Sequence, residues 1–343
     1  MEAPSSRATT MSCRLKAGLR TRARLRTGAH LEFSHHSLSA LNEMKATAQP
    51  LATVASAEKG WAAIYADLFK ARLTFLVLLT ALVGFYLGSF GPVDYLLMLH
   101  TLLGTALVAS GASALNQLWE RKYDAQMRRT QDRPLPSGRL QPSTVLLIGC
   151  ACAVTGSCYL GLAVNWLTSF LGACSLLIYL FVYTPLKRVT WLNTVVGAIP
   201  GGLPPLMGWT AARGHLSADG WALFGILAIW QLPHFMAIAW MYRDEYARAG
   251  FRMLPVVDPD GHRTGSQAVS HTLALLPVSL CPSLVKLTGP IYFAGALVLG
   301  LVFIWSAVQF SRHLTISRAR QLFYVSIVYL PLLLGLMVLD KLR

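Results

Sequence analysis

Charge is what this sequence lacks most. Only 13% of its 343 residues are Asp, Glu, Lys or Arg, whereas an ordinary soluble domain carries about 25%. Hydrophobic residues make up 54%, and they occur in blocks close to the length that crosses a bilayer. This composition excludes an ordinary soluble globular protein and predicts an integral membrane protein that is in contact with lipid.

Paired cysteines and nucleic-acid motifs are also missing. The six cysteines contain no CxxC pair, and five of them lie inside apolar blocks, so neither a zinc site nor a disulfide framework is expected. The net charge of +15 does not indicate nucleic acid, because the basic residues flank the apolar blocks and no zinc-finger or RNP-like pattern accompanies them.

The apolar blocks predict an all-α protein, a bundle of nine transmembrane helices. The fifth block is the least regular, because Pro200, Pro204 and Pro205 interrupt it. Such breaks are tolerated where neighbouring helices satisfy the backbone, and they often mark a cavity wall. The blocks lie at 73–90, 95–116, 143–163, 166–184, 191–210, 219–241, 267–286, 289–310 and 321–339.

The distribution of basic residues predicts the orientation. Fifteen Lys and Arg residues lie in the connections that follow the second, fourth, sixth and eighth blocks, whereas only Arg213 and Lys286 lie in the opposite connections. The positive-inside rule then places the N-terminus inside and the C-terminus outside. The long connections 117–142 and 242–266 lie on the inner face, where we expect the chemistry.

Residues 1–58 are expected to form a basic extension that precedes a membrane domain at 59–343. Residues 1–43 are rich in Arg and Ser and poor in acid, which is typical of a mitochondrial transit peptide. The alternative is a true start at Met44 in a bacterial gene. A bacterial cell membrane is the favoured location, with the mitochondrial inner membrane as the alternative.

The first candidate site is the segment NQLWERKYDAQMRRTQDRPLPSGR. Asn116, Glu120 and Asp124 are spaced i, i+4, i+8, which lines up three oxygen-bearing side chains on one helix face. Such ligands suit Mg²⁺, and Arg129 and Arg133 would hold other oxygens of a diphosphate. The alternative, about equally supported by spacing alone, is a solvated helix end whose acids pair with Arg121, Lys122 and Arg128.

Two further segments lie at the inner face. In YTPLKR, Tyr183 and Lys187 are four residues apart, although an aromatic and basic membrane anchor explains this segment better by physics alone. His234 lies within the sixth apolar block, and an ionisable residue at that depth predicts either function or a satisfied structural histidine. Asp244, Glu245 and Arg248 follow, as a second cluster or as ordinary loop ion pairs.

Together these motifs resemble the UbiA-type intramembrane prenyltransferases, and among them the heme O synthases. The pattern N-x-x-x-E-x-x-x-D-x-x-M-x-R-T-x-x-R-P-L covers 116–135, and YTPLKR, W-Q-x-P-H-F and D-E-Y-x-R-A-G-x-x-M-L-P follow at 183–188, 230–235 and 244–255. The resemblance extends over about 60–340. It implies a central cavity, open to the inner side and to lipid, in which farnesyl diphosphate, water and protoheme (heme B) give heme O and diphosphate.

The resemblance also implies residue roles. Magnesium would be held by the first motif, with Asp244 and Glu245 as further ligands. The diphosphate would contact Arg129, Arg133, Tyr183, Lys187, Arg188 and Arg248. The heme would contact His234, Trp230 and Gln231. Because the family's usual second aspartate motif is replaced here by WQLPHFMAIAWMYRDE, the resemblance favours heme over a quinone precursor.

Two other classes compete with this reading. A prenyltransferase that acts on an aromatic or quinone ring would share every diphosphate feature. A transporter would explain nine spans, but transporters place polar determinants near the midplane of repeated halves, and no repeat is evident here. The expected partners are the lipid bilayer and, from the resemblance, a heme A synthase or a terminal oxidase in assembly.

Overall fold

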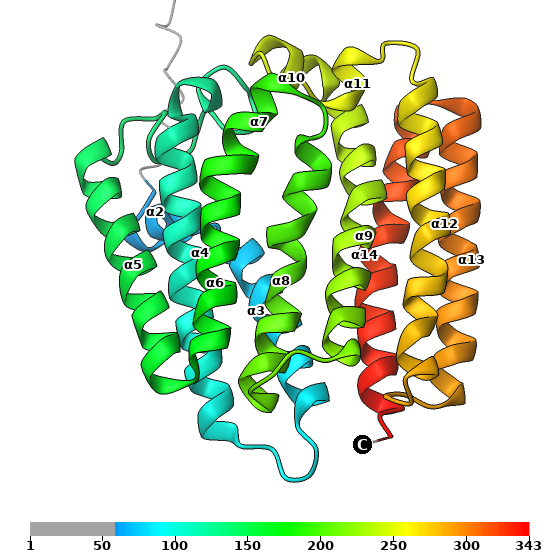
Figure 1. Ribbon diagram of the computed structural model, residues 1–343. Coiled ribbons are helices and arrows are strands. Elements are labelled where there is room, and N and C mark those ends of the chain that lie inside the picture. Colours follow the sequence, from blue (N-terminus) through cyan, green and yellow to red (C-terminus); the bar gives the residue numbers. More distant parts are fainter. Residues whose placement is uncertain (1–58, 343) are drawn as a thin grey trace, which may run out of the picture. The chain divides into compact units, whose positions relative to one another are not determined.

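The computed structural model describes residues 59–342, and these fold almost entirely into helices (Figure 1). The expected extension at 1–58 lies outside the described residues. The first helices are α2 (Trp61–Leu68), α3 (Ala71–Gly88), α4 (Tyr95–Asp124), α5 (Pro142–Ala163) and α6 (Trp166–Leu177), which continues through a π-helix, η1 (Ile178–Tyr183), into α7 (Thr184–Val189). The others are α8 (Asn193–Arg213), α9 (Ala218–Met241), α10 (Arg243–Arg248), α11 (Leu254–Val257), α12 (His262–Leu284), α13 (Pro290–His313) and α14 (Ile316–Leu339).

Seven of the described helices are long and apolar enough to cross a membrane. They are α3, α4, α5, the continuous segment Trp166–Val189, α9, α13 and α14, and each matches a predicted apolar block. The two remaining blocks form α8 and α12, which have 21 and 23 residues but contain prolines and polar residues that lower their apolar character. The protein is therefore a multi-pass membrane protein, and a ninefold crossing stays a prediction.

The α4 helix extends beyond its predicted apolar block. Its 30 residues continue from the block's expected end at Asn116 through Glu120 to Asp124. Asn116, Glu120 and Asp124 therefore occupy the last turns of a transmembrane helix, as their spacing predicted. This extension carries the motif's oxygen atoms into the interior of the bundle.

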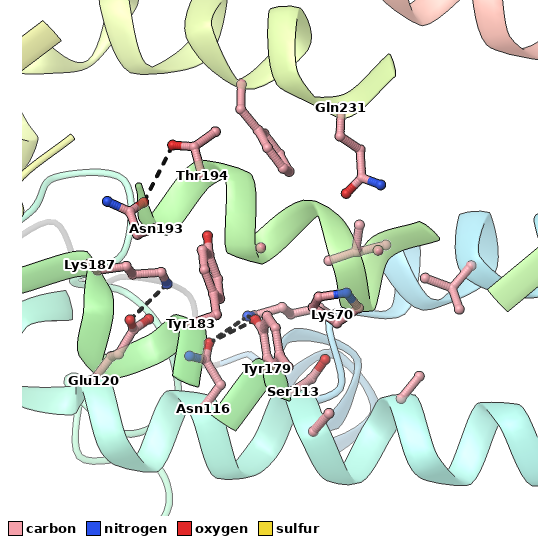
Figure 2. Close-up of a pocket in the computed structure, with 18 of the residues that line it drawn as sticks. Lys70, Ser113, Asn116, Glu120, Tyr179, Tyr183, Lys187, Asn193, Thr194 and Gln231 are labelled. Carbon is pink, nitrogen blue, oxygen red and sulfur yellow. Dashed lines mark hydrogen bonds and ion pairs between the residues drawn. The ribbon is translucent and has the colours of Figure 1, made fainter. Parts of the chain in front are cut away.

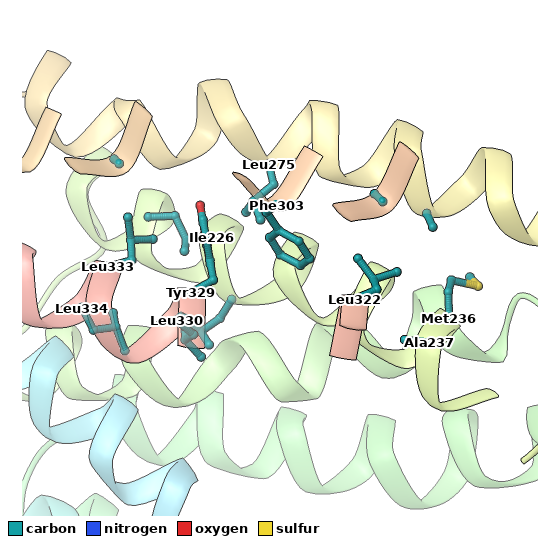
Figure 3. Close-up of a cluster of buried hydrophobic side chains, with 14 of the residues drawn as sticks. Ile226, Met236, Ala237, Leu275, Phe303, Leu322, Tyr329, Leu330, Leu333 and Leu334 are labelled. Carbon is teal, nitrogen blue, oxygen red and sulfur yellow. The ribbon is translucent and has the colours of Figure 1, made fainter. Parts of the chain in front are cut away.

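The largest buried cluster joins α9, α12, α13 and α14 (Figure 3). Phe303 and Tyr329 pack with ring centroids 5.1 Å apart, and the hydroxyl of Tyr329 makes a 2.7 Å hydrogen bond with that of Ser279. Large apolar side chains on the outer surface, such as Leu147 and Val298, remain exposed. This distribution fits helices that meet lipid outside and each other inside.

The close approach of α3 to α8 depends on glycine. A Cβ atom at Gly208 would overlap the carbonyl oxygen of Ala81, and one at Gly84 would overlap the carbonyl oxygen of Pro205. Small residues at helix contacts let membrane helices approach closely and gain van der Waals packing. This contact fixes α8, which forms one wall of the candidate site described below.

The connections with many basic residues share one end of the bundle, at the top of Figure 1. The ends of α4, α7 and α13 and the short helices α10 and α11 all lie there, whereas the α3–α4 connection and the C-terminus lie at the opposite end. The charge asymmetry expected from the sequence is therefore an asymmetry between the two ends of the folded bundle.

We predict that Gly208→Ala destabilises the protein by about 1–3 kcal/mol, because the added methyl forces α8 away from α3. The measurement is thermal unfolding in detergent. Gly335→Ala is the matched control, since a Cβ there meets nothing within 4 Å and alanine favours helix. Equal melting temperatures for the two variants would contradict the proposed close contact.

Candidate active site

A cavity of about 360 Å³ lies between α3, α4, the α6–α7 segment, α8 and α9. It changes character along its length. Its polar lining includes Lys70, Asn116, Glu120, Asp124, Arg129, Arg133, Tyr179, Tyr183, Lys187 and Gln231. Its apolar lining includes Leu73, Val77, Val108, Ala109, Ala112, Pro204 and Met207. The cavity therefore joins a charged region to an apolar one inside the bundle.

The three candidate metal ligands line this cavity from α4. Asn116, Glu120 and Asp124 are only 1%, 5% and 1% exposed. Burial of two carboxylates at a helix end is costly unless each is paired. Their position rules out the alternative of a solvated helix end.

Each of the three side chains is paired with a different cation. Lys70 donates from Nζ to Asn116 Oδ1 at 2.9 Å, and Lys187 donates to Glu120 Oε1 at 2.7 Å (Figure 2). Arg133 donates from Nη1 to Asp124 Oδ2 at 2.8 Å. The tertiary structure therefore builds a row of three oxygen–cation pairs along one wall.

A second row faces α4 from the α6–α7 segment. Tyr179 and Tyr183 stack with ring centroids 5.5 Å apart, and Lys187 Nζ lies 4.6 Å from the centroid of the Tyr183 ring. The π-helix η1 carries both tyrosines, and π-helical turns occur often at functional sites. The ring of Tyr183 has room because α8 carries Gly197 there, where a Cβ would be 2.6 Å from that ring.

Lys70 is a site residue that the sequence reasoning missed. It precedes α3 in a left-handed conformation with φ of 49°. Gln117 holds this turn by donating from Nε2 to the carbonyl oxygens of Asp67 and Leu68 at 2.9 and 2.8 Å. Burial, with repulsion from Arg133 and Lys187, lowers the pKa of Lys70 to about 7. The only sequence signal was a lysine next to the first apolar block.

Tyr179 and Thr184 were also missed, and both contact Asn116. Tyr179 donates its hydroxyl to Asn116 Oδ1 at 3.2 Å, and Asn116 donates from Nδ2 to Thr184 Oγ1 at 3.1 Å. These bonds turn the amide oxygen toward Lys70 and the cavity. The spacing of Tyr179 four residues before Tyr183 was a signal that could have found it.

The acceptor candidates from α9 divide between two faces. Gln231 lines the cavity, and it fits because α8 has Gly201 opposite its amide. Trp230 and His234 face α14 instead: Trp230 donates to the carbonyl oxygen of Ser326 at 2.8 Å, and His234 Nδ1 is 2.7 Å from Ser326 Oγ. Neither Trp230 nor His234 lines the cavity.

The second acidic pair lies away from the cavity lining. The side chain of Asp244 is 90% exposed and 3.8 Å from Arg243, and Glu245 accepts a 3.5 Å hydrogen bond from the backbone nitrogen of Arg129. The guanidinium carbon of Arg188 lies 4.5 Å from the centroid of the Tyr123 ring, and Arg188 does not line the cavity. Arg248, on α10, is exposed and also outside it.

The chemistry of the donors limits where a metal could bind. Within residues 59–342, no group of three or more His, Cys, Asp and Glu side chains is placed to hold a metal ion. The α4 row offers two carboxylates and an amide oxygen instead, which is the oxygen chemistry that Mg²⁺ uses while it keeps positions for water and phosphate. This row therefore fits a magnesium ion that is shared with a phosphate-bearing ligand.

A helical membrane protein with a charged and apolar cavity is equipped to bind an amphiphile that carries a phosphate group. The family model described as the UbiA prenyltransferase family matches residues 77–330. The chain belongs to this family. The resemblance noted from the sequence motifs is thereby confirmed.

Named relatives match most of the chain. A protein of Solibacter usitatus (strain Ellin6076) named protoheme IX farnesyltransferase is 48% identical over 286 residues, which are 81% of this chain and 98% of that one. The human mitochondrial protein of the same name is 40% identical over 278 residues, 81% of this chain and 62% of that one.

Solved structures share the fold at low sequence identity. A digeranylgeranylglyceryl phosphate synthase has a TM-score of 0.70 at 15% identity, over 81% of this chain and 98% of that one. A UbiA homolog from Archaeoglobus fulgidus bound to GPP and Mg²⁺ has a TM-score of 0.56 at 16% identity, over 80% and 99%. These structures support the all-helical UbiA fold.

We predict that Lys187→Met or Glu120→Gln alone weakens the fold, by roughly 3 kcal/mol for the lysine substitution, because one partner of a buried pair is left uncompensated. The double substitution should recover part of the loss. Thermal unfolding of the four proteins in detergent measures this coupling. Strictly additive losses would show that the 2.7 Å contact contributes no interaction energy.

Proposed function

We propose that this protein transfers the farnesyl group of farnesyl diphosphate to a vinyl group of protoheme IX, with addition of water, giving heme O and diphosphate. The observation that carries the proposal is the row of three buried oxygen–cation pairs at the head of an apolar cavity. The names of the relatives, at up to 48% identity, support protoheme as the acceptor.

The diphosphate is assigned to the cations of the row. Lys70, Arg133 and Lys187 converge on the cavity from three separate segments, and phosphate oxygens can replace the α4 oxygens as their partners. Such an exchange keeps every buried charge paired throughout binding. It also releases the oxygen atoms of Asn116, Glu120 and Asp124.

We assign Mg²⁺ to the released oxygens of Asn116, Glu120 and Asp124. When bound, the ion neutralises charge on the leaving diphosphate and so favours ionisation. Thr184 and Tyr179 hold the amide of Asn116 in place, and such supporting contacts govern metal affinity strongly. Asp244 and Glu245 are left out of this assignment because they do not line the cavity.

The reaction begins when the C1–O bond of farnesyl diphosphate breaks and its electron pair leaves with the diphosphate. Lys70, Arg133 and Lys187 stabilise the developing negative charge. The ring faces of Tyr179 and Tyr183 lie beside this row and can stabilise the allylic cation by cation–π attraction. The apolar lining keeps bulk water from capturing that cation.

The terminal vinyl carbon then forms a bond with C1 of the farnesyl cation. The positive charge moves to the vinyl carbon next to the porphyrin, where the oxygen of a water molecule adds and a proton leaves. We assign Gln231 to the acceptor side of the cavity. Trp230 and His234 instead fix α9 against α14, so they are positioning residues that aim Gln231 inward.

The apolar end of the cavity is assigned to the farnesyl chain. From Asn116 to Thr105 the α4 axis advances about 16 Å, and an extended farnesyl chain measures roughly 14 Å at ordinary carbon–carbon distances. Val108 and Met207 belong to a packed cluster at this end. The length of the cavity therefore suits a chain of three isoprene units.

The membrane arrangement is part of the same proposal. We propose that α8 and α12 also cross the bilayer, which gives nine spans, with the basic end of the bundle and the N-terminus inside and the C-terminus outside. The bacterial cell membrane is favoured because the more similar named relative is bacterial. The product would pass to a heme A synthase or a terminal oxidase in assembly.

The deciding experiment incubates the purified protein with protoheme, farnesyl diphosphate and Mg²⁺ and separates the hemes by chromatography. We expect a more hydrophobic heme with the mass of a hydroxyethylfarnesyl derivative, which is lost with a chelator or with Asp124→Asn. Asp244→Asn is the matched control and should retain activity. Unchanged protoheme, with transfer to a quinone precursor, would reassign the acceptor.

The chain-length assignment predicts that Thr105→Phe shifts the preferred donor from farnesyl to geranyl diphosphate, by about tenfold in the ratio of kcat/KM values, because the ring shortens the apolar end. Leu103→Phe is the control, since Leu103 is 47% exposed on the outer surface. An unchanged preference in Thr105→Phe would place the farnesyl chain elsewhere.

A further inference from the structure

Arg129 differs from the other cations of the cavity in its partners. Its guanidinium carbon lies 5.2 and 5.7 Å from the ring centroids of Tyr242 and Tyr246, and its Nη2 donates to the Tyr246 hydroxyl at 3.1 Å. Within residues 59–342 no carboxylate forms an ion pair with this guanidinium. Its contact with Glu245 is through the backbone nitrogen.

The position of Arg129 also separates it from the oxygen–cation row. Lys70, Lys187 and Arg133 pair with oxygens of α4, whereas Arg129 turns toward the end of α9 and toward α10 across the cavity. It is exposed, yet it contributes to the cavity lining. Because it is both exposed and part of the lining, Arg129 marks the mouth of the cavity, where its guanidinium has no carboxylate partner among the described residues.

The wall beside Arg129 is aromatic and apolar. Tyr246 and Phe251 are 8% and 3% exposed, with ring centroids 6.2 Å apart, and Met253 and Phe235 continue this lining. A flat, apolar ring system with a charged edge suits such a wall, since aromatic rings favour stacked or edge contacts. A diphosphate has no aromatic or apolar surface that would pack against this wall.

We infer that Arg129 binds a propionate carboxylate of the tetrapyrrole acceptor at the mouth of the cavity. This inference rests on the proposed function and deepens it. A guanidinium matches a carboxylate with two parallel hydrogen bonds. The rings of Tyr242 and Tyr246 beside the guanidinium hold its plane. The assignment replaces the diphosphate role that the sequence motif implied for Arg129.

Such an anchor orients the acceptor. Protoheme carries its vinyl groups on the edge of the ring opposite to its propionates. With the propionates at the mouth, the vinyl edge points inward along α4, which rises about 12 Å from Asp124 to Asn116. The reacting vinyl carbon then lies at the depth of Tyr179 and Asn116, where the allylic cation forms.

The test measures heme O formation by Arg129→Gln with protoheme and with protoheme dimethyl ester, whose propionates carry no charge. We expect the KM for protoheme to rise roughly tenfold or more, as for the loss of a charge-assisted hydrogen bond, and the KM for farnesyl diphosphate to stay unchanged. With the dimethyl ester, the variant and the unaltered protein should have equal KM values.

Three further variants serve as comparisons for this result. Arg128→Gln removes a neighbouring exposed arginine and should change neither KM. Arg129→Lys keeps the charge but not the paired donors, so its KM for protoheme should be intermediate, and it serves if Arg129→Gln fails to fold. Arg133→Gln should show the opposite split, with its main effect on farnesyl diphosphate.

The inference fails if substitution of Arg129 raises the KM for farnesyl diphosphate instead, which would return this residue to the diphosphate. It also fails if the variant discriminates equally against protoheme and its ester. Failure of the proposed function looks different, because the unaltered protein would then form no heme O from either acceptor.

Discussion

The pairing of three oxygen ligands with three cations along α4 is the interaction on which the rest of the site depends. Asn116, Glu120 and Asp124 are almost completely buried, and at that burial two carboxylates persist only with partners. Lys70, Lys187 and Arg133 supply those partners from different segments of the chain. In the function proposed above, phosphate oxygens and a metal ion would replace these partners, so that the interaction which stabilises the free protein would also prepare the site for its ligands.

Local features of the surrounding helices position the side chains beside this row. The π-helix before α7 places Tyr179 and Tyr183 beside Asn116, and glycines of α8 leave room for Tyr183 and Gln231. Gln117 fixes the turn that carries Lys70. On α9, Gln231 faces the cavity while His234 and Trp230 bond to Ser326 of α14. Packing on one face of a helix thus sets the aim of a functional side chain on the other.

Two walls of the cavity differ in their chemistry. The wall of α4 and α7 holds charges that pair with one another, whereas the wall of α9 and α10 is aromatic and presents Arg129 without a carboxylate partner. Membership of the UbiA family explains the first wall, since a prenyl diphosphate is the substrate class that its residues suit.

Several features followed from the order of residues alone: the membrane-spanning character, the asymmetry of charge between the two ends, the alignment of Asn116, Glu120 and Asp124 on one helix, and the family. These depend on composition and on spacing along one helix, which are local properties. Other features could not be predicted in this way. They are the pairings of Lys70, Arg133 and Lys187 with α4, the orientation of His234 toward α14 rather than the cavity, and the position of Asp244 outside the cavity lining. The Arg133–Asp124 pair depends on how the connection after α4 folds back over nine residues. The others depend on how a helix is rotated about its axis and on which helix lies beside it, and these are set by packing between segments far apart in the sequence.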